Sequence, residues 1–356
     1  MRLIYDSQSK LSEAESQWHD LLRIFLLMQV VFGHISGIAL PTIPELWIDS
    51  EHNWPLIFFR IIWRFGAQAA YLFIFLSGFM VAGPLLANIS KRQKFTAQEF
   101  FSRRLRRIFP IAAVAVFLTA LLDTLARAFP GAEEFYHRSY AYDMFAAFNW
   151  VNFVGNLLFL QPIAVDSFGS NGPLWTLGYI VQYYVIGWIL FSILKRNQLF
   201  AITSLLLTLT IMSAIDIEWS LLFLAWVAGG ISRHLFIPKR LTSAFLLSGI
   251  IFLISSNIFH SIALIIPSGF FLTVALHNSS AVPSILSGSW LRKISNDSYT
   301  IYATHHPVLM CIYAIVFSGA ASTNLLFSLY FVIAFVAVLG VSIAVNKLVT
   351  YFSISR

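Results

Sequence analysis

The sequence has few charged residues and only one cysteine. Lysine, arginine, aspartate and glutamate together make up 11 % of its 356 residues, whereas a soluble globular domain carries about 25 %. This shortage of charge excludes an ordinary soluble domain. The single cysteine, Cys311, excludes an internal disulfide and any metal cluster built on several cysteines.

The first twenty residues lack the features of a cleavable signal peptide. They mix acidic and basic side chains, with no basic leading segment and no small-residue cleavage site. We therefore expect the first spanning helix to act as the insertion signal. The sequence also shows no internal repeat, no low-complexity tract and no linker to a second domain, so any catalytic unit is expected to lie in the membrane.

Long apolar runs recur along the whole chain, which is 58 % apolar. About ten of these runs approach the ~20 residues that a helix needs to cross a bilayer. We predict an all-α integral membrane protein with a single bundle of about ten transmembrane helices. Tails at 1–20 and 349–356 flank the transmembrane domain at 21–348. The predicted spans are 21–41, 66–87, 108–129, 173–194, 199–216, 219–236, 241–258, 260–277, 298–319 and 325–348.

Basic residues concentrate on one side of the predicted spans. Of the 23 Lys and Arg residues, 19 lie in or beside the two termini and every second loop. The opposite loops carry acidic residues instead. Because basic loops remain in the cytoplasm, both termini are predicted to be cytoplasmic, and the net charge of +7 reflects orientation and not nucleic acid binding. The predicted cytoplasmic loops are 88–107, 195–198, 233–240 and 278–297.

The segment 130–172 is too polar for a lipid-facing span. It begins with a polar stretch and continues as WVNFVGNLLFLQP, which contains Asn152, Asn156 and Gln161. We predict an outer loop followed by a helix that dips into the membrane or lies at its interface.

Arg23 and His34 lie in the first apolar run, eleven residues apart. Eleven residues are close to a whole number of turns, so both side chains share one helix face, roughly 16 Å apart along the axis. A titratable side chain inside a spanning helix is costly and marks a functional site by default. His34 could be a general base acting on a hydroxyl, or a buried histidine bonded to a neighbouring helix. Arg23 could equally be a cation that snorkels at the helix end.

Seven basic residues lie between residues 88 and 110, and four of them form a dense cluster: Arg103, Arg104, Arg106 and Arg107. One interpretation is anchoring to anionic lipid head groups. The other is a phosphate-rich cytoplasmic ligand, such as a nucleotide or coenzyme A, because the guanidinium group binds phosphate through two parallel hydrogen bonds.

Two adjacent histidines, His305 and His306, lie early in the ninth predicted span. Neighbouring helical residues point about 100° apart, so we expect at most one of them to face a given site. His305 is expected to reach the same membrane depth as His34. The spacing does not support a metal site.

Two other polar or small positions lie inside predicted spans. Asp123, in the third span, is expected to pair with Arg127 one turn on. The small residues of Ser77–Phe79 suit close helix packing.

Six segments, in order along the chain, resemble the membrane-bound acyltransferase-3 family. The matching segments are Asp20, Arg23 and His34 (D-x-x-R with a histidine eleven residues after the arginine), LFIFLSGF at 72–79, Arg104, Arg107, Ile108 and Pro110, NLLFL at 156–160, PLWTLGYIVQYY at 173–184, and Ser298, Tyr299, Tyr302, His305 and Pro307. One departure stands out, because the family's paired glutamates in the fourth-span block fall at Ile180 and Val181 here.

The resemblance implies transfer of an acyl group, usually acetyl but in some cases succinyl, from cytoplasmic acyl-CoA to a hydroxyl of a cell-surface polysaccharide or lipid-linked glycan. This activity would be located in a bacterial inner membrane. Acyl-CoA is then a donor substrate and no cofactor is permanently bound. Membrane lipid and polysaccharide assembly machinery are the other expected partners. His34 would deprotonate the acceptor or carry the acyl group.

The resemblance also implies a set of site residues. His34, Arg23 and His305 would be catalytic, Arg103, Arg104 and Arg107 would bind the donor, and Trp175 and Tyr299 would bind substrate. The competing class is a proton-coupled transporter or flippase for a glycan or lipid-linked intermediate, although the repeat that many transporters show is undetected. A weaker alternative is a lipid-binding scaffold for a polysaccharide synthase.

Overall fold

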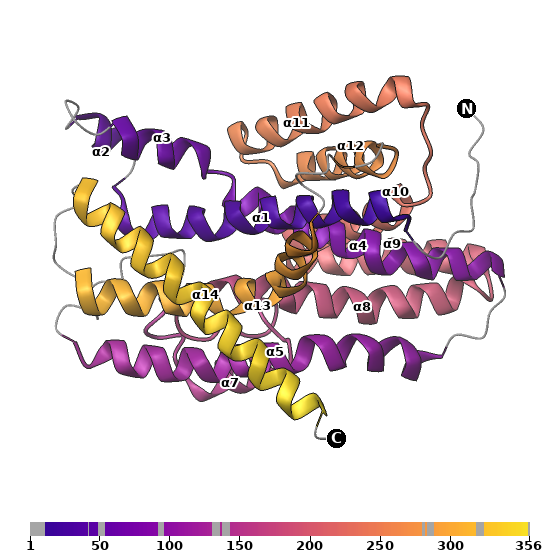
Figure 1. Cartoon of the computed structure of the whole chain (residues 1–356). Coiled ribbons are helices and arrows are strands. Elements are labelled where there is room, and N and C mark those ends of the chain that lie inside the picture. Colours follow the sequence, from indigo (N-terminus) through magenta and orange to yellow (C-terminus); the bar gives the residue numbers. More distant parts are fainter. Residues whose placement is uncertain are drawn as a thin grey trace. The chain divides into compact units, whose positions relative to one another are not determined.

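The computed structural model describes residues 11–41, 43–48, 54–91, 96–129, 136, 143–279, 282, 288–317 and 324–354. Within these ranges the regular structure is helical and contains no strand (Figure 1). The all-α prediction is confirmed. Some predicted loop positions, among them Glu51, Glu133, Glu134 and Arg138, lie outside the described residues.

Each predicted span corresponds to one helix: α1 (Glu13–Ala39), α4 (Gly66–Lys91), α5 (Ala97–Arg127), α8 (Trp175–Leu194), α9 (Gln198–Ile215), α10 (Ile217–Ser232), α11 (Thr242–Ile258), α12 (Ile265–His277), α13 (Ser289–Ile312) and α14 (Asn324–Ile354). Three further helices are α2 (Ile43–Ile48), α3 (Trp54–Ile62) and α7 (Trp150–Leu157). Short 3₁₀ turns are η1 (Gly172–Leu174), η2 (Lys239–Leu241) and η3 (Ile262–Leu264), and η5 (Tyr313–Phe317) is a π-helical turn.

Seven helical segments of the described chain are long and apolar enough to cross a membrane. They contain α1, α3 with α4, α5, α8, α9, α11 and α14. α10 and α12 are apolar but shorter, with 16 and 13 residues, and α13 begins with the polar sequence SWLRKISND. The chain is therefore a multi-pass membrane protein. The count of ten spans and the cytoplasmic placement of both termini remain predictions.

Two helices begin earlier in the sequence than the predicted spans, and each of these starts has a capping box. The Ser12 amide donates to Glu15 Oε2 at 2.6 Å, and the Glu15 amide donates to Ser12 Oγ at 3.3 Å. This reciprocal pair stabilises the start of a helix, so α1 begins at Glu13, eight residues before the predicted span at 21–41.

The same device acts between Thr96 and Glu99, so α5 begins at Ala97. The segment 88–107, predicted as a cytoplasmic loop, is therefore helical at 88–91 and 97–107, and the arginine cluster lies on α5. At the other end of the chain, α14 continues to Ile354, because its apolar sequence has no stop signal at the predicted tail.

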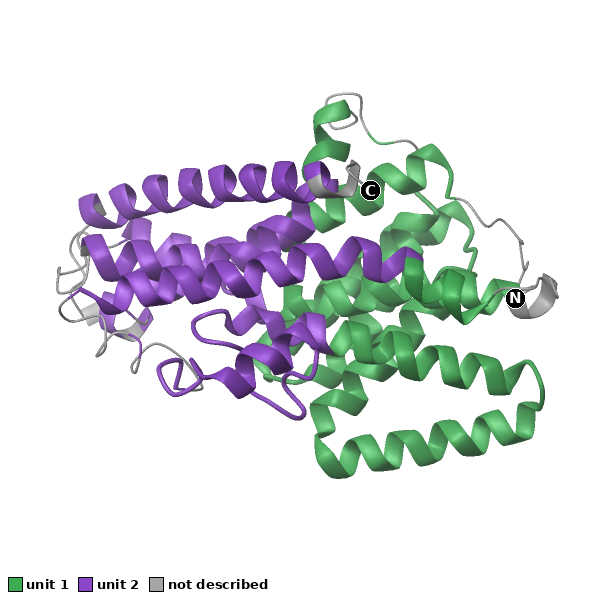
Figure 2. Cartoon of the chain, turned by 90° about the horizontal axis from the view of Figure 1, so that it is seen from below, with its two compact units in different colours: residues 1–26, 68–102, 179–295 green, residues 27–67, 103–178, 296–356 purple. Residues whose placement is uncertain are grey.

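The helices group into two compact units (Figure 2). Unit 1 comprises residues 1–26, 68–102 and 179–295, and unit 2 comprises residues 27–67, 103–178 and 296–356. Helices α1, α4, α5, α8 and α13 contribute residues to both units.

In unit 1, α12 packs against α10 and α11, and α10 packs against α9. α4 and α10 approach so closely that a Cβ at Gly78 would lie 1.8 Å from the Trp226 carbonyl oxygen, and one at Gly229 would lie 2.1 Å from that of Phe75. The small residues predicted at Ser77–Phe79 thus serve close helix packing.

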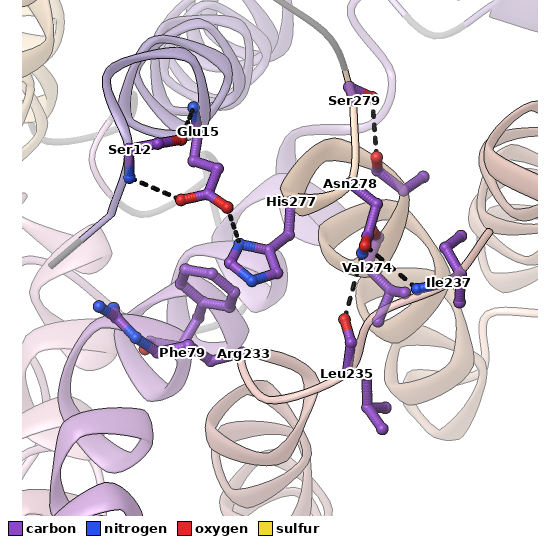
Figure 3. Close-up of polar contacts among 11 residues, drawn as sticks. Ser12, Glu15, Phe79, Arg233, Leu235, Ile237, Val274, His277, Asn278 and Ser279 are labelled. Atoms are coloured by element: carbon purple, nitrogen blue, oxygen red, sulfur yellow. Dashed lines mark hydrogen bonds and ion pairs between the residues drawn. The ribbon is translucent and has the colours of Figure 1, made fainter. Parts of the chain in front are cut away.

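One end of unit 1 joins three segments that were predicted to share the cytoplasmic side (Figure 3). Glu15, at the start of α1, lies 3.4 Å from His277 Nδ1 at the end of α12. Asn278 donates to the Leu235 carbonyl and accepts from the Ile237 amide. The N-terminal segment and the loops after α10 and α12 therefore meet, as the charge pattern predicts.

Contacts also join helix ends at the positions predicted to lie on the opposite side from the cytoplasm. Tyr179 donates to Asp216 at 2.7 Å, and Asn257 donates to Gln68 at 3.1 Å. Asp216 lies in a loop that was predicted to face away from the cytoplasm.

Candidate active site

Three histidines from two helices of unit 2 gather into one cluster. The ring centroid of His34, on α1, lies 5.2 Å from that of His305 and 4.7 Å from that of His306, both on α13. His34 and His305, which were expected to reach a similar membrane depth, thus lie close together. The expectation that only one of the adjacent histidines would face the site is wrong, because the His34 ring approaches both of their rings.

The segment of α1 that carries His34 is held by α3 and the turn that follows it. Arg60 donates to the carbonyls of Ser36 and Leu40 at 2.8 and 2.9 Å, which satisfies carbonyl groups at the end of α1. The Gln29 amide donates to the Ile62 carbonyl at 3.3 Å, which explains a polar residue in an apolar stretch. Gly33 allows this approach, since a Cβ there would lie 2.9 Å from the Trp63 carbonyl oxygen.

The three rings differ in their access to solvent. His305 and His306 are 0 % and 1 % exposed, whereas His34 is half-buried. His34 is therefore the member of the cluster that a substrate can reach most directly. The rings of His305 and His306 lie beside it in the interior, where they can influence its chemistry.

Main-chain carbonyls fix the proton positions on the two buried rings. His305 Nδ1 lies 2.7 Å from the Tyr302 carbonyl oxygen, and His306 Nδ1 contacts the Ser170 carbonyl oxygen. A carbonyl oxygen only accepts hydrogen bonds, so both Nδ1 atoms carry the proton and both Nε2 atoms of the neutral rings are bases. His305 Nε2 has no hydrogen-bond partner among the described residues.

Pro307 explains a further buried contact beside the cluster. Proline has no amide proton, so it cannot bond the carbonyl of Ala303, four residues earlier. Asn171 supplies the missing donor, with Nδ2 at 2.9 Å from the Ala303 oxygen, and also donates to Thr119 Oγ1 at 3.0 Å. A buried carbonyl is thereby satisfied.

A family model described as an acyltransferase domain, that of acyltransferase 3, matches residues 16–347. The chain belongs to this acyltransferase family. No curated protein and no solved structure matches it. Together with its long apolar helices, this membership identifies the protein as a membrane acyltransferase.

Two of the segments that resemble this acyltransferase family contact each other directly in unit 2. Thr176, in the PLWTL sequence, donates to the Tyr302 hydroxyl at 2.9 Å, and Tyr302 donates to the Pro173 carbonyl at 3.2 Å. These bonds position α13 one turn before His305. The structure thus uses both segments to support the histidine cluster.

Asp123 of the acyltransferase is fully buried and receives three hydrogen bonds. The donors are the Ser170 amide at 2.7 Å, the Ser170 hydroxyl at 2.6 Å and the Tyr136 hydroxyl at 3.1 Å. Burial and the neighbouring Asp123 carboxylate raise the pKa of Tyr136, so its phenol keeps the donated proton.

The expected partner of Asp123, Arg127, makes other contacts. Its guanidinium group lies 3.9 Å from the Phe145 ring centroid and 4.2 Å from that of Phe148, and it donates to the Phe145 carbonyl. The prediction that Asp123 pairs with Arg127 missed two features. The Arg127 guanidinium group lies over the rings of Phe145 and Phe148, and Asp123 accepts hydrogen bonds from Ser170.

Arg23, predicted to be catalytic, lies on α1, and the three predicted donor-binding arginines lie on α5. Arg23 pairs with Asp20 at 3.5 Å, one turn earlier on α1, and Asp20 also accepts from Ser295 at 2.6 Å. Arg103 and Arg107 are exposed on α5 and Arg104 is half-buried. On this helix, Arg103 and Arg107 are one turn apart and share a face.

The two predicted substrate-binding residues are both half-buried. Trp175 begins α8. The Tyr299 hydroxyl donates to the Ile108 carbonyl at 3.0 Å, so it ties α13 to α5.

Sequence reasoning missed Ser170, Asn171 and the contribution of His306. The polar run SFGSNG at 167–172 and the proline at 307 were the available signals, because a proline within a helix leaves a carbonyl that needs another donor. Three neighbouring histidines also suggest a metal site, but among the described residues no group of three His, Cys, Asp or Glu could hold a metal ion.

Proposed function

We propose that this membrane acyltransferase transfers an acyl group, most simply acetyl, from cytoplasmic acyl-CoA to a hydroxyl of a cell-surface polysaccharide or lipid-linked glycan. Its location would be the inner membrane of a bacterium, beside polysaccharide assembly machinery. The observation that carries the proposal is the cluster in which a half-buried His34 lies against two fully buried histidines, His305 and His306.

In the proposed reaction, His34 takes the proton of the acceptor hydroxyl. The acceptor oxygen bonds to the thioester carbon, the carbon–sulfur bond breaks, and the proton passes from His34 to the leaving sulfur. The alternative route forms an acyl-His34 intermediate that the acceptor then attacks. Both routes yield the acyl ester and coenzyme A, and His305 would assist or orient His34 in either.

The remaining predicted residues have roles consistent with a coenzyme A donor. Arg103, Arg104 and Arg107 would hold donor phosphates, because arginine binds phosphate with a planar pair of donors. Trp175 and the ring of Tyr299 would contact substrate.

The test is the consumption of radiolabelled acetyl-CoA by detergent-purified protein in the presence of a bacterial glycolipid extract. We expect release of coenzyme A and alkali-labile label in the extract, with neither in protein-free detergent. A transporter would leave acetyl-CoA intact, and intact acetyl-CoA would contradict the proposal.

The donor assignment makes a second prediction. Arg104→Ala should raise the Kd for acetyl-CoA, and the difference from the wild type should shrink as salt rises, because screening weakens exposed ionic contacts. Arg196→Ala, an exposed arginine between α8 and α9, is the matched control and should bind like the wild type. Titration by calorimetry checks this, and an unaltered Kd for Arg104→Ala would leave the cluster as a lipid anchor only.

A further inference from the structure

The turn before α8 places Ser170 against Asp123 in the interior of unit 2. Gly169 has a φ of +53°, a conformation that glycine adopts without strain. A Cβ at this position would also lie 2.2 Å from Asp123 Oδ2. Glycine therefore lets the turn approach the carboxylate closely enough for both the amide and the hydroxyl of Ser170 to donate to it.

Ser170 connects Asp123 to the histidine cluster. Its amide and hydroxyl are held by the carboxylate, and its carbonyl oxygen accepts the Nδ1 proton of His306. Asp123, Ser170 and His306 are all at most 1 % exposed, so water does not compete for these contacts. The carboxylate thus fixes the acceptor that decides which nitrogen of His306 carries the proton.

His306 differs from His305 in how it is oriented. The acceptor for His305 is Tyr302, three residues earlier on the same helix. The acceptor for His306 is 136 residues away in sequence, and it comes from a turn that Asp123 holds. The His306 ring lies nearly perpendicular to that of His34, at 83°, so an edge of one ring meets the face of the other.

We propose that Asp123 is a positioning residue for acyl transfer, acting through the Ser170 carbonyl to hold His306 with its proton on Nδ1 and its Nε2 lone pair available to His34. This inference rests on the proposed function of His34. His306 Nε2 then stabilises the imidazolium that His34 becomes when it takes the acceptor proton. His306 stays neutral, and the proton leaves from His34 to the coenzyme A sulfur.

The test compares kcat and KM for acetyl-CoA, measured by release of the coenzyme A thiol, in two variants. His306→Asn keeps an N–H near the position of Nδ1 but has no Nε2, so we expect kcat to fall about 100-fold. Asp123→Ala should lower kcat about 10-fold or more, because a small misplacement of catalytic groups can slow a reaction by about 100-fold. KM should stay within about twofold of the wild type in both, since the donor site is untouched.

Two further variants separate positioning from loss of structure. His277→Asn removes a buried histidine of unit 1 and should leave kcat unchanged. Ser170→Ala keeps both main-chain contacts and loses one hydroxyl bond, so its loss in kcat should be smaller than that of Asp123→Ala.

The outcomes are distinct. A wild-type kcat in His306→Asn overturns the inference even if Asp123→Ala fails to fold. A fall in kcat that only matches the loss of folded protein overturns the role of Asp123. A wild-type protein that releases no coenzyme A overturns the proposed function itself.

Discussion

At the scale of single residues, the proposed chemistry depends on where protons lie on three histidine rings. Carbonyl acceptors at Tyr302 and Ser170 place the protons of His305 and His306 on Nδ1. The rings of His305 and His306 are then neutral and buried, and they lie beside a half-buried His34. A cluster that keeps its buried members neutral avoids the cost of burying charge and leaves the proton transfer to His34.

Asn171 provides a residue-scale prediction about stability. Asn171→Ala should lower the free energy of unfolding by about 1–3 kcal/mol, because the buried Ala303 carbonyl loses its donor. In a Pro307→Ala background the restored amide can bond the same carbonyl, so the cost should fall by at least about 0.5 kcal/mol. Thermal unfolding of the four proteins in detergent checks this, and strictly additive costs would contradict it.

At the scale of elements, capping and close packing decide the helix boundaries and crossings. Hydrophobicity alone located one helix for each predicted apolar span, since apolar length is the main signal for a membrane helix. The starts of α1 and α5 were missed because the capping boxes at Ser12–Glu15 and Thr96–Glu99 extend helices into polar sequence. The short helix α3 was missed because its sequence is interrupted by Arg60, whose role at the end of α1 is visible only in the structure.

The site was predictable to a similar degree. The spacing of Arg23 and His34 and the order of motifs indicated a site containing His34 and His305. The approach of His306 could not be predicted, because its orientation depends on Ser170 in a turn 136 residues away. The polar run at 167–172 indicates a turn, but every residue has a main-chain carbonyl, so the sequence does not show which carbonyl His306 contacts.

The crossing of α4 and α10 provides an element-scale prediction. Gly78→Ala should destabilise the protein by about 1–3 kcal/mol, because the new methyl group would overlap the Trp226 carbonyl oxygen. Gly340→Ala on α14 is the matched control, since a Cβ there meets nothing within 4 Å. Melting temperatures in detergent compare the two, and equal values would show that the crossing relaxes without cost.

At the scale of the whole molecule, the charge pattern and the contacts at the two ends of unit 1 agree. Segments predicted to share a side meet at Glu15 and His277, and segments predicted for the other side meet at Tyr179 and Asp216. The prediction that these sides are the cytoplasm and its opposite can be tested independently of activity.

Reporter fusions provide the whole-molecule prediction. A reporter that is active only in the cytoplasm should work after Arg196, Lys239 and Arg356, and should be silent after Asp216 and Thr323. The reason is that the basic loops remain inside during insertion. A signal that reverses at every position downstream of the segment 144–172 would show that this segment crosses the membrane.

The central claim is that His34 performs the proton or acyl chemistry of the transfer. The most direct measurement is the initial rate of coenzyme A release from acetyl-CoA by equal amounts of folded wild-type and His34→Ala protein. The control is His260→Asn, which replaces an exposed histidine with φ +48° by a residue that tolerates this conformation. We expect the control to match the wild type and His34→Ala to be about 10²–10⁴-fold slower. A His34→Ala protein that keeps more than about half of the wild-type rate, far above the loss expected for a general base, would contradict the claim.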